Sequence, residues 1–161
     1  MELMIVRHAI AEERRPDLDD EERALTPKGR KRFAQSAQAL AGLGLRVDRI
    51  VHSPWRRAAE TAALLAPICD APPLASELLA RAPDSALLEL LAADRFEAPS
   101  LALVGHEPWL SELLAWLVVG DPTDGDARFE LKKGAIALLS GTPAPGQMQL
   151  RALLPPRVLR G

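Results

Sequence analysis

Two histidines and two arginines could act together on an anion in this sequence. They are Arg7, His8, Arg57 and His106, with Arg56 as an alternative to its neighbour Arg57. Arginine holds phosphoryl oxygens through charge-assisted and often bidentate hydrogen bonds, and a neutral imidazole can attack phosphorus. The sequence lacks the HExxH, clustered-cysteine and P-loop patterns of zinc hydrolases and nucleotide-binding proteins. Taken together the four residues favour chemistry on a phosphoryl group, although each one alone is explained as a buried histidine or a surface ion pair.

The segments that must position these side chains are short strands. Leu3–Val6, Val47–His52 and Ser100–Val104 have the length and apolar content of strands, and each is followed at once by polar residues. In a parallel sheet the carboxyl ends of the strands meet at one edge, which is where ligands bind. We therefore expect the four side chains to converge at that edge.

A hydroxyl residue followed by proline predicts the start of a helix at two places. Thr26–Pro27 opens a helix with apolar residues on one face, which ends at Gly42. Ser53–Pro54 gives the same signal, so we expect Ser53 to be an N-cap and the helix to run to about Leu65. The two neighbouring arginines then lie in the first turn, where a cation is favourable only beside an anion.

The second half of the chain adds helices and then consecutive strands. Pro72–Ser76 allows a short strand, Asp84 caps a leucine-rich helix, and Trp109–Val119 is apolar almost all round, as in a buried helix. Three further strands are expected close together at Arg128–Lys132, Ala135–Ser140 and Met148–Leu154. Strands that alternate with helices and then follow one another predict an α/β protein, a three-layer α/β/α sandwich with a mostly parallel sheet and an antiparallel edge.

Length and composition narrow the class of protein. The 161 residues suit a single domain over residues 1–161. With 20 basic and 22 acidic residues the net charge is −2, which disfavours a nucleic-acid partner. Cys69 is the only cysteine, so no internal disulfide can form. No apolar run suits a membrane span or a signal peptide, and we expect a cytoplasmic monomer.

Two charged segments have no assigned role in the chemistry. The acidic run Asp17–Glu22 follows His8 in a polar loop, and we expect it to be a solvated surface, with a rim over a pocket as the alternative. The pair Lys132 and Lys133 lies near the last strands, and the sequence does not indicate what it binds.

These motifs resemble those of the histidine phosphatase superfamily, and within it the small SixA-type phosphohistidine phosphatases. The matching segments, in chain order, are Val6–Ala9, Leu25–Gly29, Ser53–Ala58 with Thr61, Val104–Pro108 and Gly134–Ala137. Ala9 stands where much of the superfamily has glycine, and the small phosphatase branch tolerates alanine there. The resemblance covers nearly the whole chain and implies a phosphoglycerate mutase-like fold, with a six-stranded mixed sheet that contains one antiparallel strand.

The resemblance also implies roles for the site residues. His8 would be the nucleophile that forms a phosphohistidine intermediate, Arg7 and Arg57 would hold the phosphoryl oxygens, and His106 would donate to one of them. Arg57 is preferred over its neighbour because it fits the Ser-Pro-x-x-Arg-Ala pattern. Glu77 aligns loosely with the general acid of larger relatives, but an exposed glutamate at a strand end explains it as well. We expect no metal or other cofactor, because the arginines take the place of a metal.

The expected substrate is a phosphorylated protein. Between Glu77 and His106 there is room for one helix and one strand but not for a long lid, so the cleft should be open to a side chain of a partner. Phosphohistidine also leaves as an imidazole, which depends less on a general acid than an alkoxide does. We expect hydrolysis of protein phosphohistidine, as in a histidine-to-aspartate phosphorelay. The alternatives are a small-molecule phosphomonoester phosphatase, a phosphoglycerate mutase-like enzyme, or a non-catalytic phosphoryl-binding module.

Overall fold

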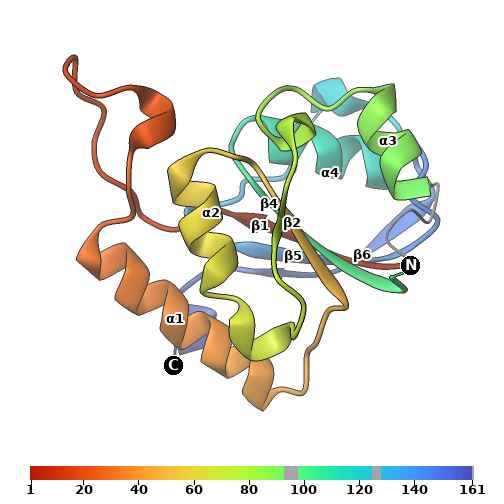
Figure 1. The fold of residues 1–161 in the computed structure, drawn as a ribbon. Helices are drawn as coiled ribbons and strands as arrows, with labels where there is room; N and C mark the ends of the chain where they lie inside the picture. The colour runs from red at the N-terminus through yellow and green to blue at the C-terminus, as the bar shows by residue number, and fades with distance from the viewer. Residues whose placement is uncertain (93–97, 125–127, 161) are drawn as a thin grey trace.

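One mixed sheet of six strands forms the centre of the computed structural model, which describes residues 1–92, 98–124 and 128–160 (Figure 1). The strand order is β3-β2-β4-β1-β5-β6. The strands are β1 (Glu2–Arg7), β2 (Arg49–His52), β3 (Leu74–Ala75), β4 (Ser100–Gly105), β5 (Ile136–Gly141) and β6 (Met148–Leu154).

The strand directions confirm the predicted mixed sheet. Neighbouring strands from β3 to β1 are parallel, and β5 is antiparallel to both β1 and β6. Because β6 again runs with the first four strands, the sheet has one antiparallel strand, as the resemblance implies. The expected antiparallel edge is confirmed, since the edge strand β6 pairs antiparallel with β5.

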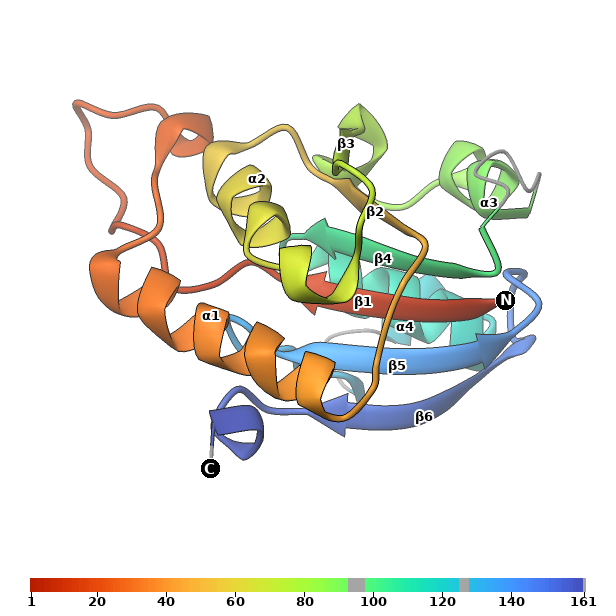
Figure 2. The ribbon, with the colours of Figure 1, turned by 60° about the horizontal axis from the view of Figure 1, so that its bottom comes forward.

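Among the elements with described bounds, four α-helices cover the two faces of the sheet. Helices α1 (Pro27–Gly42) and α2 (Arg56–Ala63) lie on one face, and α3 (Ser85–Ala92) and α4 (Trp109–Val119) lie on the other (Figure 2). Short 3₁₀ helices complete the described chain: η1 (Asp20–Glu22), η2 (Ala66–Ile68), η3 (Glu77–Leu79), η4 (Pro122–Asp124) and η5 (Val158–Arg160). The predicted three-layer α/β/α sandwich is confirmed.

Strand β1 contributes to both cores because its side chains alternate between the two faces. Met4 and Val6 are buried with α1 and α2, whereas Leu3 and Ile5 are buried with α3 and α4. A strand that is buried on both faces has a continuous apolar sequence, and this pattern is the one that predicted β1. In the described residues no helix combines the length and the apolar character that crossing a bilayer requires.

The start of α1 is fixed against the loop that follows His8. The hydroxyl of Thr26 accepts the amide of Gly29 at 3.0 Å and donates to the carbonyl oxygen of Ile10 at 3.3 Å. A Cβ at Gly29 would lie 2.0 Å from that same carbonyl oxygen, so only glycine allows this approach. The predicted N-cap is confirmed, and the loop is held at a fixed distance from the helix.

Two local predictions are wrong. Helix α2 begins at Arg56 with Trp55 as its N-cap, because the hydroxyl of Ser53 is bonded to the ring of His106 instead of capping the helix. Residues 129–132 form no strand. The carbonyl oxygens of Leu131 and Phe129 accept hydrogen bonds from side chains of β1 and α4, which replaces the partner strand that a ladder would need.

Candidate active site

The register of the parallel strands brings the candidate residues to one edge of the sheet. Arg7 pairs with Gly105, and the amide of His8 donates to the carbonyl oxygen of that glycine at 3.0 Å. Ser53 follows β2, and its amide donates to the carbonyl oxygen of Val104 at 2.9 Å. The first residues beyond β1, β2 and β4 therefore lie side by side.

A cavity of about 500 Å³ opens at this edge. The structure brings Arg7, His8, Arg57 and His106 together in its wall, and Glu77 does not line it. The other lining residues are mostly charged or aromatic, namely Glu12, Glu13, Arg14, Arg23, Trp55, Glu107, Pro108, Trp109 and Lys133. A cavity with several cations and two buried imidazoles is suited to an anionic group.

His8 is held as a neutral ring with its Nε2 lone pair directed into the site. Its Nδ1 lies 2.7 Å from the carbonyl oxygen of Ala9, which can only accept, so the hydrogen bond assigns the proton to Nδ1. Nε2 accepts a hydrogen bond from Nε of Arg57 at 3.2 Å. Burial lowers the pKa of His8 to about 3, and the charges of Arg57 and Arg7 oppose protonation further. The ring is thus neutral, which is the form in which an imidazole can act as a nucleophile.

Arg57 is buried beside His8, whereas Arg56 is not. The guanidinium of Arg57 lies 4.7 Å from the centre of the Trp55 ring, which supports it through a cation–π contact. Burial lowers the pKa of Arg57, but an arginine remains charged throughout the physiological range. Arg56 is exposed and pairs with Glu60 at 3.2 Å. The structure therefore places Arg57, and not its neighbour, where it can hold an anion at Nε2 of His8.

Asp20 occupies the outer side of Arg57. Its carboxylate lies 3.1 Å from Nη2 of Arg57, and its carbonyl oxygen accepts from Nη1. Burial opposes its charge, but the neighbouring guanidinium groups of Arg57, Arg23 and Arg14 lower the pKa of Asp20. The preference for a solvated surface at the acidic run is wrong at Asp20, because the folded loop pairs this carboxylate with Arg57 and Arg23, which line the cavity.

The loop that carries Asp20 is tied to the beginning of α2, beside which both ribbon views draw it (Figures 1 and 2). The hydroxyl of Thr61 accepts the amide of Ala9 at 3.0 Å and donates to the carbonyl oxygen of Arg57 at 2.6 Å. The amide of Leu25 donates to the carboxylate of Glu60 at 2.7 Å. The two ends of the loop are thus joined to the helix that carries Arg57.

Arg7 approaches the site from β1 and retains a free donor. Its Nη1 donates to the carbonyl oxygen of Leu131 at 2.7 Å, and its buried Nε has no partner among the described residues. Burial lowers the pKa of Arg7, while the charges of Glu107 and Glu130 favour its cationic form. The unsatisfied donor makes Arg7 a second group that can bind an oxyanion.

Ser53 is hydrogen-bonded to the ring of His106. Its hydroxyl oxygen accepts the amide of Trp55 at 3.3 Å and lies 2.8 Å from Nε2 of His106. In the tautomer in which the hydroxyl donates to Nε2, the ring proton of His106 is on Nδ1. That Nδ1 is buried and has no partner in the described structure. Burial, with the neighbouring His8 and Arg57, lowers the pKa of His106 to about 2, so the ring is a neutral donor.

Two half-buried tryptophans complete the wall next to His106. The ring centre of Trp55 is 4.5 Å from that of His106, and Trp109 lies 6.0 Å from it in an edge-on arrangement. The two indoles are themselves 5.8 Å apart. They restrict the imidazole of His106 to one orientation and give the cavity an aromatic side.

Two carboxyl groups differ from what the resemblance implies. Glu77 begins η3, is exposed and lies outside the cavity. Glu107 lies in the cavity wall, where burial raises its pKa although hydrogen bonds from Ser111 and the charge of Arg7 act in the opposite direction. A raised pKa favours the protonated form of the carboxyl group, so Glu107 is a second candidate acid.

Sequence reasoning missed Ser53 and Lys133 as parts of the site, and it considered the run that contains Asp20 only as an alternative rim over a pocket. The signal for Ser53 was present, since it precedes a proline directly after a strand, but an N-cap explains that pattern equally well. Lys133 enters the cavity because Gly134, at φ +79°, turns the chain so that its amide donates to the carbonyl oxygens of Arg7 and His8. Within the described residues, no group of three or more potential ligands is arranged to hold a metal ion.

Comparisons with known proteins agree with this arrangement. The sequence pattern of the histidine phosphatase superfamily (branch 1) matches residues 3–81. An uncharacterized protein of Picosynechococcus sp. (strain ATCC 27264 / PCC 7002 / PR-6) is 38% identical over 146 residues, which cover 88% of this chain and 86% of that protein.

Two solved structures share the fold at low sequence identity. The protein histidine phosphatase SixA complexed with tungstate is 24% identical, with a TM-score of 0.80 and 99% of each chain covered. Phosphoserine phosphatase from Entamoeba histolytica in complex with 3-phosphoglyceric acid is 18% identical, with a TM-score of 0.74 and 98% of each chain covered.

Proposed function

This chain belongs to the histidine phosphatase superfamily, and we propose that it removes the phosphoryl group from phosphohistidine on a protein partner. The observation that carries the proposal is the neutral ring of His8, whose Nε2 lone pair faces Arg57 in a cavity shared with Arg7 and His106. A nucleophile within a cationic clamp is what phosphoryl transfer requires. The solved SixA structure holds tungstate, a tetrahedral oxyanion of the same geometry as phosphate.

In the first step the lone pair of Nε2 on His8 attacks phosphorus in line with the leaving group. The new P–N bond forms as the bond to the substrate nitrogen breaks. The electron pair stays on that nitrogen, and the substrate ring, protonated on its other nitrogen, leaves as neutral imidazole. Arg7 and Arg57 bind the non-bridging oxygens, and Nδ1–H of His106 donates to one of them. These contacts stabilise charge where it develops and remain fixed during the transfer.

In the second step water attacks the phosphorus of the phosphoenzyme. The P–Nε2 bond breaks, its electron pair returns to Nε2, and both protons of the water leave with inorganic phosphate as H2PO4⁻. The hydrogen bond from Nδ1 of His8 to the carbonyl oxygen of Ala9 keeps the ring in one orientation through both steps. The free enzyme is restored with His8 neutral.

The position of the carboxyl groups supports phosphohistidine over an alkyl phosphate. An alkoxide needs a proton from a general acid as it leaves, whereas an imidazole is a far better leaving group. Glu77, the acid that the resemblance offers, is exposed and outside the cavity, which leaves Glu107 in the cavity wall as the candidate acid. A substrate that does not depend on Glu77 fits the site best.

The test compares three substrates: a phosphohistidine protein, 3-phosphoglycerate and an aryl phosphate. We expect kcat/KM to be highest for the phosphohistidine protein, and we expect Glu77→Gln and Glu107→Gln to leave that value nearly unchanged. A preference for 3-phosphoglycerate would indicate the mutase-like or small-molecule alternative. Binding of phosphate without turnover of any of the three would indicate the non-catalytic module. Either result would contradict the proposal.

A further inference from the structure

A second cavity of about 500 Å³ adjoins the first and is lined by an excess of cations. The cations are Arg32 on α1, Lys132 and Lys133 just before β5, and Arg157 and Arg160 near the end of the described chain. Glu130 is the only acidic residue in the lining. The chain as a whole has a net charge of −2, so this basic groove is a local feature and does not follow from composition.

The floor of the basic groove is apolar. It is formed by Ile10, Leu153, Pro155 and Pro156 with Ala135. Leu153 lies on the outermost strand of the sheet and is 38% exposed. Figure 2 shows η5 next to the end of β6 and α1, the elements that carry the two sides of the groove. An apolar floor between charged rims is the anatomy of a protein interface.

The cations of the basic groove have no carboxylate partners in the described part of the chain. The ion pairs with carboxylates in the described residues are formed by other arginines, such as Arg14, Arg46 and Arg81. Unpaired like charges repel one another, and an acidic partner would remove that repulsion while it adds attraction. The groove is therefore complementary to a negatively charged surface.

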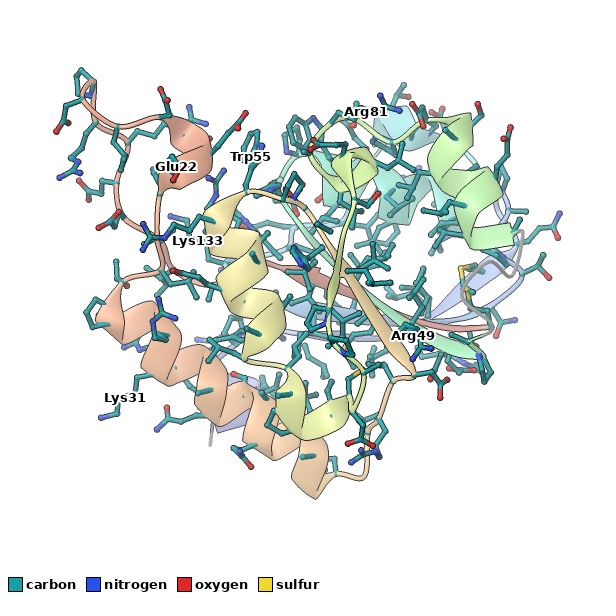
Figure 3. All side chains as sticks on the ribbon, in the orientation of Figure 1. Glu22, Lys31, Arg49, Trp55, Arg81 and Lys133 are labelled. Carbon is teal, nitrogen blue, oxygen red and sulfur yellow. The ribbon has the colours of Figure 1, made fainter. Side chains whose placement is uncertain are left out.

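Lys133 joins the basic groove to the active-site cavity, because it lines both. The turn that carries it is bonded to the backbone of Arg7 and His8 through the amide of Gly134. Figure 3 shows Lys133 and Trp55 at the same end of the molecule, with Arg49 far from both. A partner in the groove would thus present its neighbouring residues to His8 at a fixed distance.

From these features we propose that the basic groove docks an acidic, amphipathic segment of the phosphohistidine protein, next to the phosphoryl group that His8 receives. This inference rests on the proposed function. A protein segment suits the groove better than a small anion, because the five cations are spread round an apolar floor and do not converge on one point. Aliphatic residues of the segment would cover Leu153 and its neighbours, and its carboxylates would face the rims.

The test separates docking from chemistry with the double variant Arg157→Glu/Arg160→Glu. Neither residue lines the active-site cavity. We expect kcat/KM on a phosphohistidine protein to fall about tenfold or more through a higher KM, and kcat/KM on an aryl phosphate to stay within about twofold, because only the protein substrate uses the groove. Lys132→Glu, which changes a different rim, should give the same pattern.

The matched control is Arg46→Glu/Arg49→Glu, which makes the same change in net charge. Both residues are exposed and lie at or just before the start of β2, the end away from the active site. It should leave both substrates nearly unaffected. Equal losses on both substrates, or the same loss in the control, would overturn the docking proposal while leaving the proposed function intact. A wild-type enzyme that does not hydrolyse the phosphohistidine protein would overturn both. Tighter binding of an RNA oligonucleotide than of the phosphoprotein would also overturn it.

Discussion

Nε of Arg57 donates to Nε2 of His8 across 3.2 Å, so the guanidinium that would clamp the phosphoryl group already holds the attacking lone pair. The contact fixes the ring so that Nε2 faces the cavity, and it disfavours protonation of that nitrogen. An incoming phosphoryl group must enter between the two and take over the donors of Arg57. In the proposed reaction the nucleophile is therefore oriented before substrate binds and released by the substrate itself.

Arg57 and Arg56 form a matched pair of variants. Arg57→Ala should reduce kcat/KM by about 3 kcal/mol of transition-state stabilisation or more, because a buried oxyanion donor is lost. Arg56→Ala should cost little, since this side chain is exposed and pairs only with Glu60. Steady-state kinetics on an aryl phosphate measure both, and Arg57→Lys keeps the charge if the alanine variant is unstable. The reverse ranking of the two alanine variants would contradict the geometry.

The protonation of His8 and His106 can be followed by NMR. Both rings should stay neutral from pH 8 to about 5, with the proton on Nδ1 in each, because burial lowers their pKa values to about 3 and about 2. Ring-nitrogen spectra, assigned with His8→Ala and His106→Ala, test this directly. Titration of either ring with a pKa near 6.5, the ordinary value, would show that the site is more open to water than the structure indicates.

The same shifts predict how stability depends on pH. In the unfolded chain both rings bind protons near pH 6.5, whereas in the folded chain they do so only near pH 3 and below. The unfolded state therefore binds more protons as the pH falls through this interval, and stability contributed by these rings is present above pH 6.5 and lost on acidification. Urea unfolding at several pH values should show a decrease that is smaller in His8→Asn/His106→Asn. An equally steep decrease in that variant would contradict the assignment.

Most of the fold was predictable because its elements carry local signals. Thr26 and Gly42 mark the ends of α1, and the strands of the core read as short apolar runs. The convergence of His8, Arg57 and His106 followed from the rule that parallel strands end at one edge. Asp20, in contrast, lies in a loop whose path depends on the contacts of Glu60 and Thr61 with its ends, and no pattern in the sequence encodes those pairings.

The contact between Ser53 and His106 also could not be predicted from the sequence. Its sequence context predicts a helix cap, and only the packing of β2 against β4 brings its hydroxyl to His106. Ser53→Ala should lower kcat with little change in KM, because Nδ1 of His106 is no longer held as the donor to the transition state. The loss should disappear in a His106→Ala background, where the serine has no ring to orient. A full additional loss in the double variant would show that Ser53 acts elsewhere.

Asp20 competes with substrate for Arg57. Its carboxylate pairs with Nη2 at 3.1 Å and repels any anion that approaches the same guanidinium. Asp20→Asn keeps the shape of the side chain without its charge, so the inhibition constant of inorganic phosphate should fall several-fold, with a larger effect at low salt. Asp17→Asn is the control, because that residue is exposed and pairs with Arg15. Weaker phosphate binding in Asp20→Asn would mean that the carboxylate positions Arg57 instead of competing for it.

The central claim is that the phosphoryl group is transferred to Nε2 of His8, and a rapid-quench experiment with a radiolabelled substrate tests it most directly. The wild-type enzyme should acquire label that is stable in base and lost in acid, as expected for a phosphohistidine. His8→Ala should acquire none. The label on the wild-type enzyme should appear and decay in the same way when a metal chelator is present in excess, since the account assigns no step to a metal. Acid-labile label at the wild-type level in His8→Ala would place the intermediate on another residue and contradict the account.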